Sequence, residues 1–271
     1  MEKETMGADL YGTARDYGTE NMQKHILSIL KLFHHDCEKN KIKYSLNSGS
    51  CLGAVRHNGF IPWDDDADVM MTRKDFERYL EIAQGSDEYE IIRNLWIYRI
   101  KEKNSSLSAT LDIFVIDNVP DHAFMRAIKL FLIKMLQGMM KTSDNNSHFS
   151  FGYRICLMIT RLIGLPFSDA RKYRLYESIS KIGNRKETRY VGIYNNSFRA
   201  IARLYDRDLM DGVTLHAFED TKLYITKQYD KYLKSVYGDY MTPPSFDQRK
   251  SGSFEICCNG EQVMITDSKH M

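Results

Sequence analysis

Hydrophobic spacing along the first half of the chain predicts helices that alternate with strands. Apolar residues recur at spacings of three and four over residues 20–40 and again over 74–82, which is the period of an amphipathic helix. Strand-like stretches cover residues 44–46, 60–71, 90–101 and 109–116, and a short helix is expected over 51–56. This alternation predicts the α+β class, a mixed β-sheet with flanking helices.

The chain changes character from residue 122 to about residue 167. Two strongly apolar stretches with interspersed cations, 124–136 and 153–165, are typical of helices. We interpret them as helices that pack on the first half of the chain. A second interpretation is a basic amphipathic surface that makes peripheral contact with a membrane.

Composition narrows the classes of partner. The 271 residues are 43% hydrophobic and 27% charged, which is typical of a soluble globular protein, and the net charge of +2 gives no basic field for nucleic acid. The five cysteines are odd in number and form no C-x-x-C pair, so neither a disulfide framework nor a zinc site is expected. With no signal-like start and no spanning apolar run, we expect a cytoplasmic location.

An acidic run is the most informative segment. Four carboxylates lie within five positions with no cation among them, so they repel one another: Asp64, Asp65, Asp66 and Asp68. In an extended strand Asp64, Asp66 and Asp68 would share one face, and Asp65 would point to the other. Apolar residues on both sides predict a strand within a core. Such a convergence favours a hard divalent cation, Mg²⁺ or Mn²⁺.

Three alternatives compete with this metal site. A solvated acidic surface is the usual fate of a charge run, although the apolar flanks disfavour it. A calcium loop of EF-hand type requires glycine at its sixth position, where this chain has Val69. The D-x-D motif of a glycosyltransferase is the third alternative.

The residues upstream favour a phosphate ligand beside the metal. Gly49 and Ser50 precede the expected short helix, so backbone amides and a helix N-terminus would form an anion cradle, to which Arg56 and His57 add cationic or hydrogen-bonding groups. A Gly-Ser turn followed by a strand with Asp-x-Asp is the layout of the nucleotidyltransferase superfamily. That superfamily uses a third carboxylate on a neighbouring strand, and Asp112 is the candidate. Asp117 is weaker because the sequence that follows it predicts a turn.

Residues 47–68 resemble the signature of the LicD/fukutin family. The resemblance extends to Asp112-Ile113-Phe114 and, near the other end, to Phe218-Glu219, Tyr229–Leu233 and Tyr237–Pro244. It covers roughly residues 20–117 and 185–250. Two departures are Ser50-Cys51, where Thr-Leu is expected, and Ala67, where the family has a larger aliphatic residue; neither removes a carboxylate.

The resemblance implies a transferase that uses a CDP-activated donor. Family members attach phosphocholine or ribitol phosphate to glycans, so we expect Mg²⁺-dependent transfer, most readily of phosphocholine from CDP-choline, with release of CMP. The acceptor class would be a bacterial surface glycan or its precursor, such as capsule, teichoic acid or lipopolysaccharide, and the reaction would take place in the cytoplasm or at the inner face of the membrane. The alternatives are a nucleotidyltransferase that uses an NTP and an inactive binding protein.

Site roles follow from the same resemblance. Asp66 and Asp68 would hold the metal, with Asp64 as a further ligand, and Asp112 would complete the metal shell or act as general base. Gly49 and Ser50 would cradle phosphate, with Arg56 and His57 beside it. A choline group would need aromatic faces, for which the candidates are Trp63, Tyr237 and Tyr240. We expect a nucleotidyltransferase-like catalytic core over 1–120, a helical insertion over 121–184, and a C-terminal part over 185–271 that completes the site.

Overall fold

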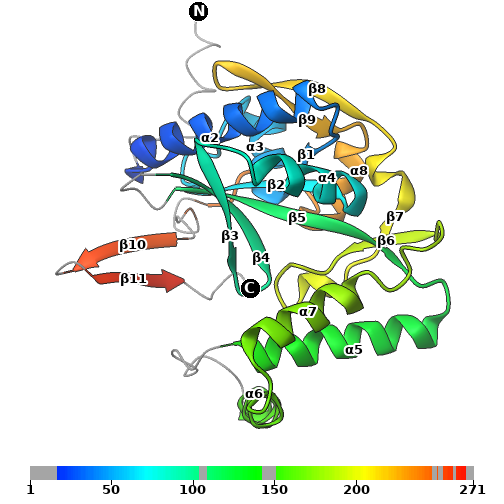
Figure 1. Cartoon of the computed structure of the whole chain (residues 1–271). Coiled ribbons are helices and arrows are strands. Elements are labelled where there is room, and N and C mark those ends of the chain that lie inside the picture. The colour runs from blue at the N-terminus through cyan, green and yellow to red at the C-terminus, as the bar shows by residue number, and fades with distance from the viewer. Residues whose placement is uncertain are drawn as a thin grey trace, which may run out of the picture. The chain divides into compact units, whose positions relative to one another are not determined.

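The computed structural model describes residues 17–103, 109–141, 151–245 and 249, and the backbone of residues 253–258 and 261–266. It confirms the α+β class (Figure 1). The α-helices of this described part are α2 (Glu20–Lys39), α3 (Ser48–His57), α4 (Arg73–Ala83), α5 (Ala123–Met140), α6 (Phe151–Gly164), α7 (Asp169–Ser180) and α8 (Tyr229–Tyr237).

Seven strands form the main sheet, in the order β1-β2-β5-β4-β3, with β6 on β5 and β7 on β6. These strands are β1 (Ser45–Leu46), β2 (Ala67–Thr72), β3 (Tyr89–Asn94), β4 (Ile97–Glu102), β5 (Thr110–Val119), β6 (Tyr190–Ile193) and β7 (Tyr205–Asp206). Two hairpins lie outside this sheet: β8 (Val213–Phe218) with β9 (Thr221–Thr226), and β10 (Ser253–Cys258) with β11 (Glu261–Thr266). β5 is buried at eight of its ten positions, as expected of a strand with neighbours on both sides.

The chain forms two compact units. The first contains the described residues of the segments Met1–Ile92, Arg99–Ile113 and Asp208–Asp267, and the second contains those of Arg93–Tyr98 and Phe114–Arg207. β5 runs from one unit into the other along a single strand. The three-part division expected from the sequence stays a prediction.

Helix α2 supplies much of the core of the first unit. Its buried positions follow the predicted helical period: Ile26, Ile29, Leu30, Phe33 and Cys37. Phe33 contacts the rings of Tyr44 and Tyr79, with ring centroids 4.8 and 4.9 Å apart. Edge-to-face packing of this kind adds to the burial of three large apolar surfaces.

The segment around the acidic run differs from the sequence prediction. β2 begins at Ala67, so residues 61–66 form a loop in place of the expected strand. Side chains from the start of α2 bind this loop: Thr19 Oγ1 donates to the carbonyl of Pro62 (2.7 Å), and Gln23 Nε2 donates to the carbonyls of Ile61 (3.1 Å) and Asp64 (2.7 Å). These bonds satisfy backbone groups that a strand would have paired with its neighbours.

Two other boundaries also differ from the prediction. Helix α3 begins at Ser48, three residues earlier than expected, so Gly49 and Ser50 lie within its first turn. The single strand expected over 90–101 is two strands, β3 and β4, separated by a turn in which Leu95 has a φ of +52°. A left-handed leucine is uncommon, so the sequence carried no turn signal there.

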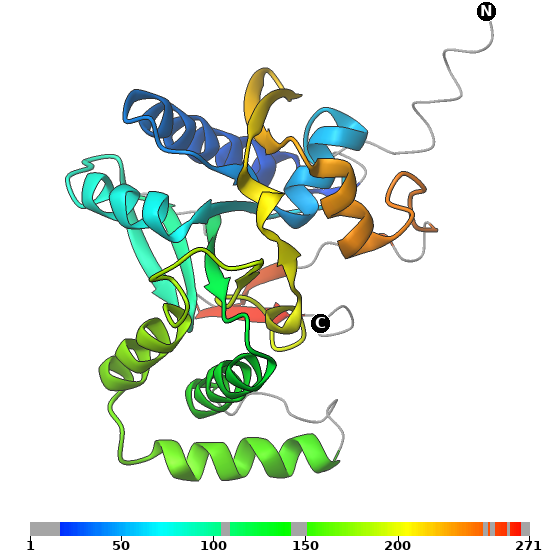
Figure 2. The ribbon, with the colours of Figure 1, turned by 90° about the vertical axis from the view of Figure 1, so that its right-hand side faces the viewer.

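The second unit contains the two predicted helices of the middle segment, α5 and α6, together with α7 (Figure 2). Its core is formed by one buried apolar cluster: Val119, Ile133, Leu136, Met139, Met140, Tyr176, Tyr194 and Ile201. None of the helices in the described part of the chain combines the length and the apolarity needed to cross a bilayer.

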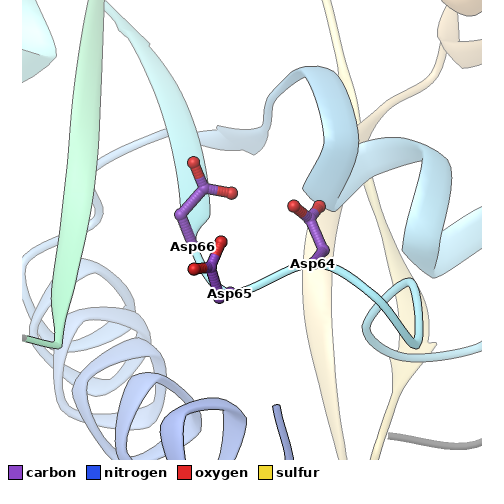
Figure 3. A group of neighbouring side chains, drawn as sticks. All are labelled: Asp64, Asp65 and Asp66. Carbon is purple, nitrogen blue, oxygen red and sulfur yellow. The ribbon is translucent and has the colours of Figure 1, made fainter. Parts of the chain in front are cut away.

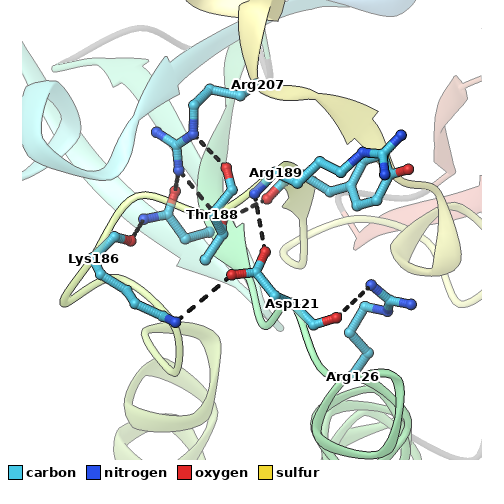
Figure 4. A network of polar contacts seen from close by, with 8 residues as sticks. Asp121, Arg126, Lys186, Thr188, Arg189 and Arg207 are labelled. Carbon is cyan, nitrogen blue, oxygen red and sulfur yellow. Dashed lines mark hydrogen bonds and ion pairs between the residues drawn. The ribbon is translucent and has the colours of Figure 1, made fainter.

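A polar network fixes the start of α5 in this unit (Figure 4). Asp121 accepts a hydrogen bond from the backbone N–H of Arg189 (3.0 Å) and lies 3.7 Å from Lys186 Nζ. Arg126 Nη1 donates to the Asp121 carbonyl at 3.1 Å. These contacts join the first turn of α5 to the segment that leads into β6.

Glycine is required where α3 meets the turn that follows it. Asn58 caps the helix with a φ of +55°, and the chain folds back so closely that a Cβ on Gly53 would lie 2.4 Å from the Gly59 carbonyl oxygen. Only a residue without a side chain fits against that backbone.

We therefore expect Gly53→Ala to lower the free energy of unfolding by about 1–3 kcal/mol, because backbone must move to admit the methyl group. Gly152→Ala is the matched control, since a Cβ there meets nothing within 4 Å. It should leave stability unchanged or raise it by up to about 1 kcal/mol. Urea denaturation of both variants makes the comparison, and equal stabilities would contradict the proposed close contact.

Candidate active site

Three acidic side chains converge in the loop that precedes β2. Asp64, Asp65 and Asp66 each place one carboxylate oxygen so that the three lie within 4.8 Å of one another (Figure 3). The strand prediction for Asp65 is wrong, since alternation would have turned its side chain away. The loop backbone removes that alternation and brings Asp65 into the cluster.

Asp68 joins the cluster from the second position of β2. Its carboxyl group interacts with Asp64, with Asp66 and, across to β5, with Asp112. Burial raises its pKa well above the usual range, and the neighbouring carboxylates raise it further. Two of the predicted metal ligands therefore come from the loop and two from adjacent strands.

The cluster resists full ionisation. Burial is the largest cause that raises the pKa of Asp64 and of Asp66, and the charge of Asp66 is the second cause for Asp64. A hydrogen bond with Asp64 and the positive charge of Arg99 oppose the rise at Asp66. So many carboxylates at this spacing need a compensating positive charge when all are ionised.

Arg99 of β4 supplies part of that charge. Its Nε lies 2.9 Å from Asp112 Oδ1 and its Nη2 lies 3.4 Å from Oδ2, which is a two-point contact with the carboxylate. Burial nevertheless raises the pKa of Asp112 to about 6, because Arg99 offsets the burial only in part. Asp112 is 8% exposed and lies near enough to Asp66 for the charge of that carboxylate to raise its pKa.

Asp117, the weaker candidate, lies elsewhere. The structure places it within β5 rather than in a turn, because the strand continues to Val119. It is fully buried in the second unit, where its Oδ1 accepts a hydrogen bond from Asn184.

The first turn of α3 is built on a strained residue. Ser48 has a φ of +40°, a left-handed conformation that costs an L-residue roughly 1–2 kcal/mol. Tyr232 of α8 offsets this cost, since its hydroxyl accepts the Ser48 N–H (3.1 Å) and donates to Asn47 Oδ1. Residues about 185 positions apart thus fix the conformation in which the helix starts.

Both predicted cradle residues contact the acidic segment. A Cβ on Gly49 would lie 2.8 Å from Asp64 Oδ2, so glycine lets that carboxylate approach the start of α3. Ser50 Oγ accepts the backbone N–H of Asp68 at 2.8 Å, which ties β2 to the helix. The N-terminus of α3 therefore lies next to the carboxylates. The Ser50 hydroxyl also holds β2 in place through its bond to the Asp68 N–H.

Arg56 and His57 lie at the other end of α3. Arg56 donates to the carbonyl of Tyr240 through Nη1 (2.9 Å) and to His57 Nε2 through Nε (3.0 Å). Burial, Arg56 and Arg249 lower the pKa of His57 to about 4, so the imidazole is neutral at physiological pH. Of Arg56 and His57, only Arg56 therefore carries a positive charge at neutral pH.

The three aromatic candidates differ in exposure. Trp63 is buried and lies 5.0 Å from the Arg249 guanidinium, and Tyr240 is buried with its hydroxyl bonded to Asp230 (2.9 Å). Tyr237, the last residue of α8, is 43% exposed. Burial of its hydroxyl group raises the pKa of Tyr237, and the nearby charges of Asp68, Asp64 and Asp66 raise it further. Of the three, Tyr237 alone combines an accessible ring with a position at the site.

This donor set fits a hard divalent cation. Carboxylate oxygens are the ligands that Mg²⁺ and Mn²⁺ prefer, and the three residues whose oxygens lie within 4.8 Å of one another in the described part of the chain are all aspartates. Burial and then mutual repulsion raise the pKa values of these carboxyl groups, and a bound cation would favour their ionised forms.

Comparison with known proteins agrees with this geometry. Residues 41–128, which span α3, the acidic loop, β2 and β5, match the family model for the LicD/FKTN/FKRP nucleotidyltransferase domain. The lipopolysaccharide cholinephosphotransferase LicD of Haemophilus influenzae is 28% identical over 251 residues, covering 82% of this chain and 91% of that protein. The chain is therefore similar to the LicD family, over residues 41–128 in the family model and over most of its length in one relative.

Two further relatives share a shorter stretch with this chain. They are uncharacterised proteins of Rickettsia prowazekii and Rickettsia typhi, each 34% identical, over 112 and 105 residues. Each match covers 36% of this chain, and 41% and 32% of the respective relative.

Sequence reasoning did not predict the contacts of three residues that shape the site. Arg99 was not singled out, and Tyr232 was noted only within a segment that resembles the family; the partner of each lies on another element. Glu219 was noted within the resemblance, and the structure gives its contact: Oε1 accepts the Phe60 N–H at 2.9 Å, which braces the turn after α3.

We expect Arg99→Met to lower the free energy of unfolding by about 2–3 kcal/mol at pH 8, because it leaves a buried carboxylate unpaired. The pKa of Asp112 already exceeds its usual 3.8 and would rise further without Arg99. At pH 5 the carboxyl group would take up a proton, so the destabilisation should shrink as the pH falls.

Denaturant titrations at the two pH values measure this effect. Lys24→Met is the control, since Lys24 forms an exposed pair with Glu20 at 2.9 Å. It should change stability by no more than about 0.5 kcal/mol at either pH. A loss for Arg99→Met that is the same at pH 8 and pH 5 would contradict the role given to Asp112.

Proposed function

We propose that this protein is a divalent-cation-dependent transferase that moves phosphocholine from CDP-choline onto a cell-surface glycan or its precursor and releases CMP. The observation that carries the proposal is the cluster of Asp64, Asp65 and Asp66 beside Asp68 and Asp112. The similarity to the lipopolysaccharide cholinephosphotransferase of Haemophilus influenzae supports the choice of phosphocholine and of a glycan acceptor. We place the reaction in the cytoplasm, at the inner face of the membrane.

Mg²⁺, or Mn²⁺ in its place, would be held by Asp64, Asp66 and Asp68, with Asp112 as a further ligand. Asp65, which the structure adds to the cluster, is a fifth candidate. When bound, such a cation would neutralise charge on the two donor phosphates and on the leaving CMP.

The chain's own groups would position the two reactants. The first turn of α3, with Gly49 and Ser50, would offer backbone N–H groups to a donor phosphate. Arg99 faces the same carboxylates from β4 and would offset negative charge that develops during transfer.

In the transfer itself, the hydroxyl oxygen of the acceptor would bond to the phosphorus that carries choline. The bond between that phosphorus and the bridging oxygen of CMP would break, and the hydroxyl proton would pass to a base. Asp112, with its pKa raised to about 6, suits that base if it is not a metal ligand.

Binding of donors tests the proposal. We expect calorimetry to show Mg²⁺-dependent binding of CDP-choline in preference to CDP-glycerol, CDP-ribitol and CTP. Asp66→Asn should weaken that binding at least about tenfold, a change of roughly 1.4 kcal/mol. Asp87→Asn, which removes an exposed carboxylate elsewhere in the first unit, should leave it unchanged.

Other outcomes would redirect the proposal. Binding of CTP alone would favour a nucleotidyltransferase, in keeping with the name of the matched domain family. Binding of a different CDP conjugate would keep the reaction and change the group transferred. Absence of binding by any of these nucleotides would contradict the donor class.

Tyr237 is the aromatic residue that we expect to contact the choline ammonium, because its ring is accessible beside the carboxylates. Tyr237→Leu should lower kcat/KM for CDP-choline about 5- to 30-fold, as loss of a cation–π contact of roughly 1–2 kcal/mol predicts. Tyr237→Phe keeps the ring and should keep most of the activity.

Steady-state kinetics with CDP-choline and with the uncharged donor CDP-glycerol separate this contact from general damage. A loss confined to the choline donor is the expected result. An equal loss with both donors would show that Tyr237 acts only by packing.

A further inference from the structure

Helix α6 turns its most apolar face toward solvent. Phe151, Met158 and Leu162 are 77%, 56% and 59% exposed, and Ile155 lies between them at 37%. At 100° per residue these four side chains fall within about 60° of one another around the helix. They form a continuous stripe, which we call the α6 stripe.

The orientation of this stripe is fixed by the opposite side of the helix. α6 crosses α5 at small residues: a Cβ on Gly138 would lie 2.4 Å from Thr160 Oγ1, and one on Gly164 would lie 2.9 Å from the Met139 side chain (Figures 1 and 2). Leu157 is buried on the same side. The α6 stripe therefore points away from α5, and the helix cannot rotate to bury it without losing this close contact.

The charges carried by α5 and α6 have one sign. Neither α5 nor α6 contains an aspartate or a glutamate, whereas α6 carries Arg154 and Arg161 on the flank of the stripe. Arg154 is exposed, and Arg161 Nε donates to the carbonyl of Lys141 at 3.0 Å. α6 thus presents apolar side chains with arginines beside them and no acid. This combination complements a partner surface that has an apolar interior and negative charges at its boundary.

We propose that the α6 stripe docks on the surface of an anionic lipid bilayer. Phe151, Met158 and Leu162 would enter the boundary between headgroups and acyl chains, and Arg154 would meet lipid phosphates. A second copy of the chain fits this face less well, because two such helices would bring arginines together with no acid on either α6 to pair with them. The proposal does not rest on the transferase activity, since it concerns residues of the second unit alone.

Vesicle co-sedimentation of the full chain tests the proposal without donor or acceptor. The protein should bind vesicles of phosphatidylcholine mixed with phosphatidylglycerol more strongly than vesicles of phosphatidylcholine alone. The double variant Met158→Ser/Leu162→Ser should bind the mixed vesicles at least about tenfold more weakly, since two buried side chains are lost from the contact. Arg154→Gln should weaken binding to the mixed vesicles and leave binding to the neutral ones unchanged.

Leu215→Ser is the matched control, because Leu215 is an apolar side chain of β8 that is 47% exposed. It should bind vesicles as the unmodified protein does. The replaced side chains are exposed, so thermal unfolding of every variant should match the unmodified protein and exclude misfolding.

Three results would overturn the proposal. They are failure of the unmodified protein to bind the mixed vesicles, equal binding by the double variant, and a dimer in analytical ultracentrifugation that the double variant abolishes. The last would assign the stripe to a second copy of the chain. Failure of the donor-binding experiment would not change the expected results of these vesicle-binding and ultracentrifugation experiments, so the two proposals are tested separately.

Discussion

Repulsion among carboxylates is the constraint on which the rest of the site depends. A chain does not gather Asp64, Asp66, Asp68 and Asp112 in one place without holding each of them there against the others. Four contacts hold them in place. Gln23 donates to the loop backbone, and Ser50 binds β2 to α3. Gly49 leaves space for the Asp64 carboxylate, and Arg99 pairs with Asp112. Burial and mutual repulsion keep the pKa values of these groups raised, and a divalent cation would stabilise their ionised forms.

Much of the first unit could be predicted from the sequence because its signals are local. Helix α2 and strand β5 carry uninterrupted hydrophobic patterns, and both were placed to within a few residues. The convergence of the acidic run could also be predicted, because four neighbouring carboxylates are unusual whatever their conformation.

The remaining features depend on contacts between distant residues. Alternation turned Asp65 away from the cluster, whereas hydrogen bonds from Thr19 and Gln23 hold the segment as a loop. The role of Arg99 could not be predicted from its own strand, because its partner Asp112 lies on β5, which pairs with β4. Tyr232 accepts a hydrogen bond from Ser48, which is 184 positions earlier in the sequence, so no local pattern indicates this contact. Local patterns locate elements, but the identity of their partners decides the details of a site.

The two units differ in what they expose. The first gathers polar groups around the acidic cluster, and its apolar side chains are largely buried in its core. The second has its own core but leaves the α6 stripe uncovered, beside arginines and without acids. The proposed active site and the proposed docking surface involve residues of separate units, so each can be altered and tested without disturbing the other.

The measurement that tests the central claim most directly is a titration of the protein with Mn²⁺ followed by electron paramagnetic resonance, in which free Mn²⁺ gives the signal that binding removes. The account predicts saturable binding at pH 7.5 that Mg²⁺ displaces and that the double replacement Asp64→Asn/Asp66→Asn abolishes. It also predicts weaker binding at pH 5, because protons then compete for carboxylates whose pKa values are raised. A signal that falls equally with the doubly substituted protein, or that does not fall at all, would contradict the account.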